Sequence, residues 1–216
     1  MMQQQEPPAE NGSAVNGRAN GTSADPGALL NILHSVKQCQ QQRVRQYTAF
    51  NASFRHFLES RDETPYRQAM VEATRVFAEV NEAVRSQELR LRQDLHDNTL
   101  ADSLAALQKG EEAKLRFTLI QQALKQSANE GRFSWQNSHS DASSLPGDSH
   151  ASPPAQGSHQ EATEPHSCCG AVAEPTEQEF NNALAEATQE LQAAVTSIND
   201  ILAELQEVEV DLDGEM

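Results

Sequence analysis

The chain of 216 residues lacks positive charge over its last part. All sixteen lysine and arginine residues lie at or before Arg132, while the thirty-two aspartate and glutamate residues divide equally between the segments before and after it. The segment 1–132 is therefore neutral, and residues 133–216 carry the whole net charge of −16. Because this charge repels phosphate groups, nucleic acid is not the expected partner of the acidic segment.

Aromatic residues, long apolar runs and cysteines are also scarce. Aromatic residues make up 5% of the chain and the mean hydropathy is −0.66, which leaves little material for a thick core. No run of about 18 apolar residues suits a bilayer span, and no basic-then-apolar leader opens the chain. Cys168 and Cys169 are adjacent in sequence, a spacing that rarely forms a relaxed disulfide, and Cys39 lies far from them. We expect a thin, soluble protein in a reducing compartment.

Ala, Gln, Glu, Leu and Arg dominate the periodic stretches, and the β-branched or aromatic clusters typical of strands are absent. We therefore predict an all-α protein, an elongated antiparallel bundle or coiled coil of about four helices. The predicted parts are a disordered tail at 1–24, a three-helix region at 25–128, a disordered linker rich in Ser, His and Pro at 129–175, an acidic helix at 176–209 and an acidic tail at 210–216.

Four local patterns predict where the helices begin, because small polar residues accept hydrogen bonds from the first turn of a helix. The patterns are Asp25–Pro26, Thr64–Pro65, Thr99 with Asp102, and Thr176 with Glu179. Within the third predicted helix, Gly110 indicates a kink, a close approach of a neighbouring helix, or a glycine that is simply tolerated.

Two of the predicted helices carry apolar stripes suited to helix packing. Between residues 66 and 91, apolar residues alternate in steps of four and three, which is typical of a coiled-coil seam. The seam residues singled out are Tyr66, Met70, Phe77, Val80, Val84 and Leu91. The stripe of the acidic helix includes Leu184, Leu191, Ile198 and Leu205. We expect both stripes to bind helices, either of this chain or of a partner.

The first predicted helix has only positive charges, whereas the last has only negative ones. The cations of the first helix are Lys37, Arg43, Arg45 and Arg55. On the acidic helix, pairs such as Glu186 with Glu190 repel by a few tenths of a kcal/mol each, while each buried Leu or Ile contributes about 1.5–3 kcal/mol. We therefore expect hydrophobic packing to decide stability, and these four cations to guide the acidic helix into the bundle.

The sequence contains no glycine-rich phosphate loop, nucleophile elbow or zincin helix, so we expect no enzyme and no cofactor. Histidines do occur in the predicted linker before Cys168 and Cys169, namely His139, His150, His159 and His166. Their intervals match no standard zinc spacing, and a solvated linker is the preferred interpretation. The four cations of the first helix lack interleaved exposed aromatic residues, so they form only a weak footprint for nucleic acid.

Residues from all three central helices carry a resemblance to a known family. They are Arg43, Tyr47 and Leu58; Tyr66–Arg67 with Glu72, Thr74 and Phe77; and Leu107–Gln108, Glu111–Glu112 and Lys114–Leu115. With them the chain resembles the required-for-excision B-type domain family, which is linked to DNA excision repair, over roughly residues 29–125 and more loosely 180–210. The resemblance implies a repair role and a nuclear location, and it transfers no catalytic or ligand-binding residue.

Our hypothesis is therefore a non-enzymatic helical adaptor in DNA excision repair that acts through contacts with proteins of a repair complex. The alternative is a coiled-coil structural or scaffold subunit, for example cytoskeletal or ciliary, in which the seam at 66–91 pairs between chains as a homo-oligomer. Direct DNA binding is a third and weaker hypothesis. We expect no membrane association, and without the resemblance the expected location is the cytoplasm.

Overall fold

The computed structural model describes residues 25–138 and 174–214, and every regular element in these ranges is a helix. The elements are α1 (Pro26–Ser60), α2 (Thr64–Gln93), α3 (Asn98–Asn129), the short α4 (Ser134–Ser138) and α5 (Glu177–Gly214). The prediction of an all-α fold with four substantial helices is confirmed. The predicted tail at 1–24 and the linker residues 139–173 lie outside the described residues.

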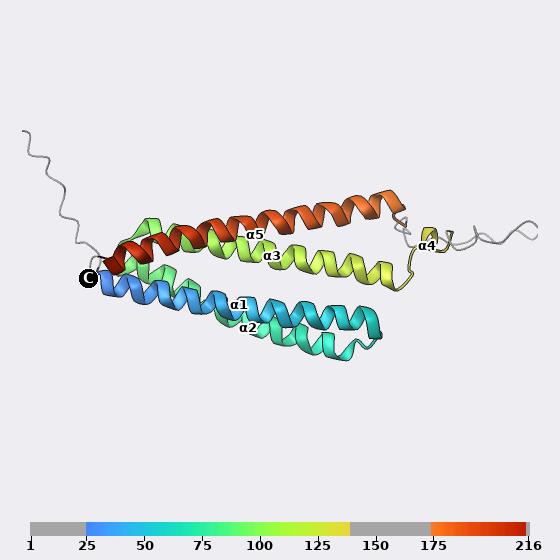
Figure 1. Ribbon diagram of the computed structural model, residues 1–216, viewed down its shortest axis with the longest axis horizontal. Coiled ribbons are helices and arrows are strands. Elements are labelled where there is room, and N and C mark those ends of the chain that lie inside the picture. The colour runs from blue at the N-terminus through green and yellow to red at the C-terminus, as the bar shows by residue number, and fades with distance from the viewer. Residues whose placement is uncertain (1–24, 139–173, 215–216) are drawn as a thin grey trace, which may run out of the picture.

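The four long helices run alternately up and down along one elongated body (Figure 1). α1 packs along α2, α2 along α3, and α3 along α5, whereas α1 and α5 contact each other only over a short stretch. This stretch lies at the end of the body where α5 terminates, and the two helices separate toward the opposite end (Figure 1). The acidic helix therefore completes the bundle chiefly by covering α3.

Two of the four predicted helix caps are confirmed. The Asp25 carboxylate accepts a hydrogen bond from the Gly27 amide at 3.2 Å, with Pro26 in the first turn. At the start of α5, the Thr176 amide donates to Glu179 Oε2 at 2.8 Å, while the Glu179 amide donates to Thr176 Oγ1 at 3.2 Å. This reciprocal pair satisfies two amides that the helix itself leaves unpaired.

The other two predicted caps are wrong, because Thr64 and Thr99 do not cap the helices at which they lie. Thr64 already belongs to α2, and Glu63 before it makes no capping hydrogen bond with its side chain. Asp62 Oδ1 accepts from the Thr64 amide at 2.9 Å in the preceding turn. Asp97 Oδ1 accepts from the Leu100 amide at 2.9 Å and caps α3, while Asp102 instead binds Arg92 at 2.7 Å. Aspartate caps a helix at least as well as threonine, so spacing alone did not separate Asp97 from Thr99 as the cap of α3.

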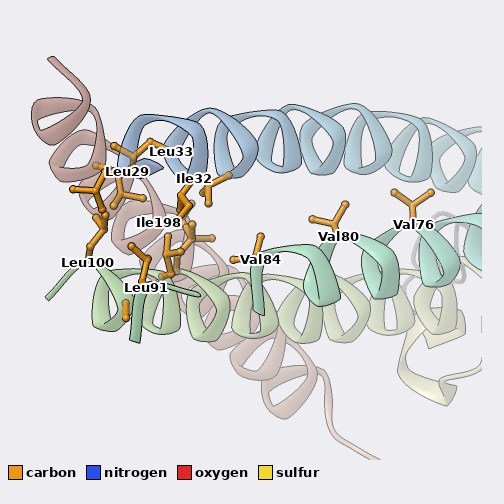
Figure 2. Packing of buried hydrophobic residues seen from close by; sticks show 14 residues of the cluster. Leu29, Ile32, Leu33, Val76, Val80, Val84, Leu91, Leu100 and Ile198 are labelled. Atoms are coloured by element: carbon orange, nitrogen blue, oxygen red, sulfur yellow. The ribbon is translucent and has the colours of Figure 1, made fainter. Parts of the chain in front are cut away.

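An aliphatic cluster occupies the end of the bundle where all four long helices meet. Figure 2 shows Leu29 of α1, Leu91 of α2, Leu100 of α3 and Ile198 of α5 gathered in this cluster. Leu91 and the neighbouring Val84, Leu104 and Leu107 are fully buried. Burial of such side chains contributes about 1.5–3 kcal/mol each, which makes this cluster the main hydrophobic support of the bundle.

The opposite half of α1 and α2 encloses an aromatic cluster instead. Its buried rings are Tyr47, Phe50, Phe54, Phe57, Tyr66 and Phe77. Phe57 stacks on Tyr66 with ring centroids 5.6 Å apart, and Tyr47 lies 4.6 Å from Phe77. Most of the chain's few aromatic residues are thus gathered in one place, where ring pairs add specific geometry to apolar burial.

Both ends of α5 differ in detail from the predicted division of the chain. Residues 210–214, predicted as an acidic tail, are helical. At its start, Phe180 packs against Phe133 and Trp135, which lie in the predicted linker, with ring centroids 5.3 and 5.6 Å away. Trp135 Nε1 also donates to the Pro175 carbonyl at 3.1 Å. The segment around α4 therefore joins the start of α5 to the end of α3.

Gly110 marks a close approach of α3 to α5. A Cβ atom at this position would lie 2.9 Å from Ile198 Cγ1, closer than packed carbon atoms come. Of the interpretations left open by the sequence, the close approach is the one that the structure supports.

Candidate interaction sites

A buried polar layer joins α1, α2 and α3, with Arg43 of α1 at its centre. The side chain of Arg43 is 1% exposed. Its Nη2 donates to Asn81 Oδ1 at 2.6 Å and to Gln108 Oε1 at 3.4 Å. In the orientation of the Gln40 amide that satisfies both neighbours, Gln40 accepts from Arg43 Nη1 at 2.8 Å and donates to Glu111 Oε1 at 2.8 Å. One cation thus links α1, α2 and α3.

Electrostatics in this layer follow from its burial. Burial lowers the pKa of Arg43, an effect that the nearby Glu111 carboxylate opposes, and burial raises the pKa of the Tyr47 hydroxyl. Lys114 Nζ lies 3.5 Å from the Glu111 carboxylate and 4.1 Å from the centre of the Tyr47 ring. Buried charges are costly unless they are hydrogen-bonded, and no buried side-chain N or O atom of the described residues lacks a partner.

A cavity of about 590 Å³ adjoins this layer. Its lining includes Arg43 and Tyr47 from α1, Phe77 and Asn81 from α2, and Gln108, Glu111 and Leu115 from α3. Many of the residues that carry the family resemblance therefore come together here, although they are far apart in the sequence. Their separate spacings within each helix did not reveal that they share one cavity.

A second hollow, here called the α1–α5 groove, has a volume of about 410 Å³. Its apolar lining consists of Leu33, Val36 and Val44 from α1 and Leu202 and Leu205 from α5. Val44 is 60% exposed, which is high for a large aliphatic side chain in such surroundings. Lys37 and Arg45 lie along the α1 wall and Glu209 along the α5 wall, so charged side chains flank an apolar floor.

Most of the predicted seam of α2 is used inside the chain. Tyr66, Phe77, Val80, Val84 and Leu91 are buried among the other helices, and Met70 is the seam residue that stays accessible. The stripe of α5 behaves similarly, since Ile198 and Leu205 are buried and Leu184 and Leu191 are half-buried. These residues hold the bundle together, and the α2 seam on which the structural-subunit alternative rested is already filled by α1 and α3.

The four predicted guiding cations have different surroundings. Lys37 Nζ lies 3.1 Å from Glu209 of α5, as the guiding role requires, and His34 lies 3.1 Å from the same carboxylate. For Arg43 the prediction is wrong, because this side chain turns inward and binds amides of α2 and α3. Arg45 and Arg55 are exposed, and among the described residues no carboxylate lies within ion-pair distance of either. α5 packs mainly on α3, which explains why α1 contributes so little charge to its docking.

Two surveys of the described segments bear on other classes of function. No helix in these segments combines the length and the apolar character needed to cross a membrane. The same residues contain no group of three or more His, Cys, Asp or Glu side chains placed to hold a metal ion. The histidines between 139 and 166 and the pair Cys168–Cys169 lie outside the described residues.

Comparison with known proteins identifies the central part of the chain. Residues 31–125 match the family model described as DNA repair REX1-B. This region belongs to the DNA repair REX1-B family. The resemblance seen in the sequence is thereby confirmed over residues 31–125, whereas its looser extension to 180–210 lies beyond the match. No curated protein and no solved structure matches the chain. Membership in the family suggests a role in DNA repair and a nuclear location.

The two hollows differ in whether their lining residues lie within the REX1-B region. This region spans most of α1, all of α2 and most of α3, and it contains every residue that lines the cavity beside Arg43. The α1–α5 groove, in contrast, has one wall in the REX1-B region and the other in α5, which lies beyond the matched residues. No catalytic domain is identified in the chain.

Proposed function

We propose that this REX1-B protein is a non-enzymatic adaptor in excision repair that holds an amphipathic helix of another repair protein in the α1–α5 groove. Its family supports the repair role. The observation that supports the mode of action is the exposed apolar floor of the groove, above all Val44.

The shape of the groove favours a helix as its occupant. α1 and α5 run in opposite directions and separate away from the end where they meet (Figure 1). A third helix packs well between two such helices, because its apolar side chains enter the space between their ridges. Val44 and Leu202 would then become buried without any change in the bundle, and their burial would contribute the main part of the affinity.

The charge of α5 defines the chemistry of the partner. α5 contains ten carboxylates and no lysine or arginine. Glu209 is paired, but among the described residues no cation lies within ion-pair distance of Glu186, Glu190, Asp200, Glu204 or Glu207. These five carboxylates lie outside the groove lining, in which the α5 carboxylate is Glu209. A partner whose lysine or arginine side chains reach from the groove onto the exposed face of α5 would complement this surface. Such charges raise the association rate and select the partner more than they raise affinity.

The test uses two matched substitutions on exposed valines. Val44→Glu places a charge on the floor of the groove, whereas Val71→Glu places the same charge on α2, where the side chain is 72% exposed and outside the groove. Cells that lack the protein are supplied with either variant, and excision of ultraviolet lesions is measured. We expect cells with Val44→Glu to fail in repair and cells with Val71→Glu to repair normally. Circular dichroism should show that both variants are folded.

A photo-crosslinking amino acid at position 44 or 71 of the full chain then identifies the neighbour in the same cells. We expect a crosslink from position 44 to a known excision-repair protein, at a segment that forms a helix with lysine or arginine on one side, and none from position 71. Equal repair by the two valine variants would contradict the proposal, as would a crosslink that is the same from both positions.

A further inference from the structure

The cavity beside Arg43 is a separate site that the proposed adaptor role does not use. It opens between α2 and α3, while the α1–α5 groove lies between α1 and α5, and the two share no lining residue. Its volume of about 590 Å³ lies within the range of small-ligand sites, which is about 300–1,000 Å³.

The innermost cation of this cavity has only neutral groups as direct partners. Arg43 donates to the side-chain oxygens of Asn81, Gln108 and Gln40, and the Glu111 carboxylate is reached only through the Gln40 amide. A guanidinium group as buried as this one, at 1% exposed, usually bonds a carboxylate directly, because a buried charge is stabilised best by an opposite charge. Arg43 therefore presents an unused preference for an anion.

The remaining charges of the lining also favour an anion. Glu88 is paired with Arg92 at 3.2 Å and Glu111 with Lys114 at 3.5 Å, so both carboxylates are already neutralised. The other charged lining residues are Arg43, Arg85, Lys109 and Glu112. With Glu88 and Glu111 paired, the rest of the lining has three cations and one carboxylate, and this excess of positive charge attracts an anion.

The uncharged part of the lining is apolar and aromatic. Tyr47 and Phe77 form a ring pair in the cavity wall, and Leu115 lies beside them. We propose that this cavity binds an organic carboxylate carrying an aromatic or aliphatic group. The carboxylate would displace the side-chain oxygens of Asn81 and Gln108 from Arg43 and bond the guanidinium group in their place. The amide N–H groups of Asn81 and Gln108 would turn to donate to the carboxylate, and the apolar group would pack on Tyr47, Phe77 and Leu115. The planar guanidinium group matches the two oxygens of such a ligand.

The experiment titrates the ¹⁵N-labelled full chain with benzoate and, separately, with benzamide, which has the same ring but no charge. We expect benzoate to shift the Nε–H signal of Arg43 and the side-chain amide signals of Asn81 and Gln108, and benzamide to bind at least about tenfold more weakly. A tenfold change corresponds to about 1.4 kcal/mol. Equal binding of the two compounds, or no shift of the Arg43 signal by benzoate, would overturn the proposal.

Since substitution of Arg43 itself endangers the fold, the variant chosen fills the cavity instead. Ala105→Leu adds volume at a lining residue without touching the guanidinium group, and Ala106→Leu makes the same change at an exposed position on α3. We expect the first to weaken benzoate binding at least about tenfold and the second to leave it unchanged. Unchanged binding in Ala105→Leu would place benzoate elsewhere and reject the site.

A third titration distinguishes the source of the carboxylate. A short peptide that ends in phenylalanine is compared as the free acid and as the C-terminal amide. Tighter binding of the free acid than of benzoate assigns the site to the end of a protein chain, and tighter binding of benzoate assigns it to a small molecule. Binding of neither compound above the level of the amide controls would contradict both sources and the proposal.

Discussion

Helices α2 and α5 have similar apolar stripes but opposite arrangements of charge. On α2, Arg75 bonds Glu72 and Glu79 at 2.6 and 2.5 Å, so its charged face is satisfied by the helix itself. On α5 every charged side chain is negative, and the structure places a cation only against Glu209 in the stretch from Glu186 to Asp213 of the described chain. Two helices of one bundle thus differ in the charge that they present to other molecules.

The two helices also differ in how many neighbouring helices they pack against. α2 lies between α1 and α3, and its seam is buried on both sides. α5 covers α3 and reaches α1 only near its own end. We infer that α2 is part of the core that determines global stability, whereas α5 is held by one main interface. A surface that selects partners by charge is compatible with such a peripheral position, because its residues are not needed for the core.

The largest expected effect is the loss of core volume in α2. Leu91 is 0% exposed and Leu89 is 48% exposed on the same helix. We expect Leu91→Ala to lower the free energy of unfolding by about 2–5 kcal/mol, because it leaves a cavity among four helices. The control, Leu89→Ala, should change it by no more than about 0.5 kcal/mol. Denaturant unfolding measures both values, and a loss for Leu91→Ala as small as that for Leu89→Ala would show that α2 is not the centre of stability.

A smaller effect is expected where α5 touches α3. Gly110→Val forces a branched side chain against Ile198, whose Cγ1 atom would already lie 2.9 Å from a Cβ atom at this position. Overpacking of this kind costs about 1–3 kcal/mol. We expect faster hydrogen exchange in α5 while exchange in α2 stays slow. Ala106→Val, at an exposed position of α3, serves as the control. Equal acceleration in α2 and α5 would mean that the two helices open together.

The smallest expected effect concerns the first turn of α5. Thr176→Ala removes the hydroxyl that accepts from the Glu179 amide at 3.2 Å, and loss of such a cap typically costs about 1 kcal/mol. Exchange of the first amides of α5 should accelerate, while Thr196→Ala, at an exposed position in the middle of α5, should have little effect. If both variants behave alike, the capping box does not hold this end.

The same turn should respond to acid. Hydrogen bonds from the Thr176 backbone amide, and then from its hydroxyl, lower the pKa of Glu179. The stabilising contribution of this carboxylate is therefore present above its ordinary pKa and is lost as the pH falls through the lowered pKa of the folded state. Amide exchange in the first turn, corrected for its intrinsic pH dependence, should increase on acidification in the wild type and to a smaller extent in Thr176→Ala, which keeps the backbone donor and lacks the hydroxyl.

Much of the fold could be predicted from local patterns in the sequence. The apolar stripes of α2 and α5, the start of α1 at Asp25 and the box at Thr176 each depend on residues within one or two turns of a helix. The cap at Asp97 was missed because the neighbouring Thr99 was a comparable candidate. The candidate sites were less predictable, since each hollow combines side chains from separate helices.

The sequence by itself determined that the chain forms long helices, that its last helix is uniformly acidic and that the central region resembles the REX1-B family. Only the tertiary structure decided that α5 lies on α3, that Arg43 turns inward to neutral amides and that Val44 stays exposed. The physical reason is that helix formation depends on neighbours in sequence, whereas leucine, isoleucine and valine stripes are chemically alike and do not name the helix they will cover. That choice depends on the joint fit of all four helices, including the contact at Gly110.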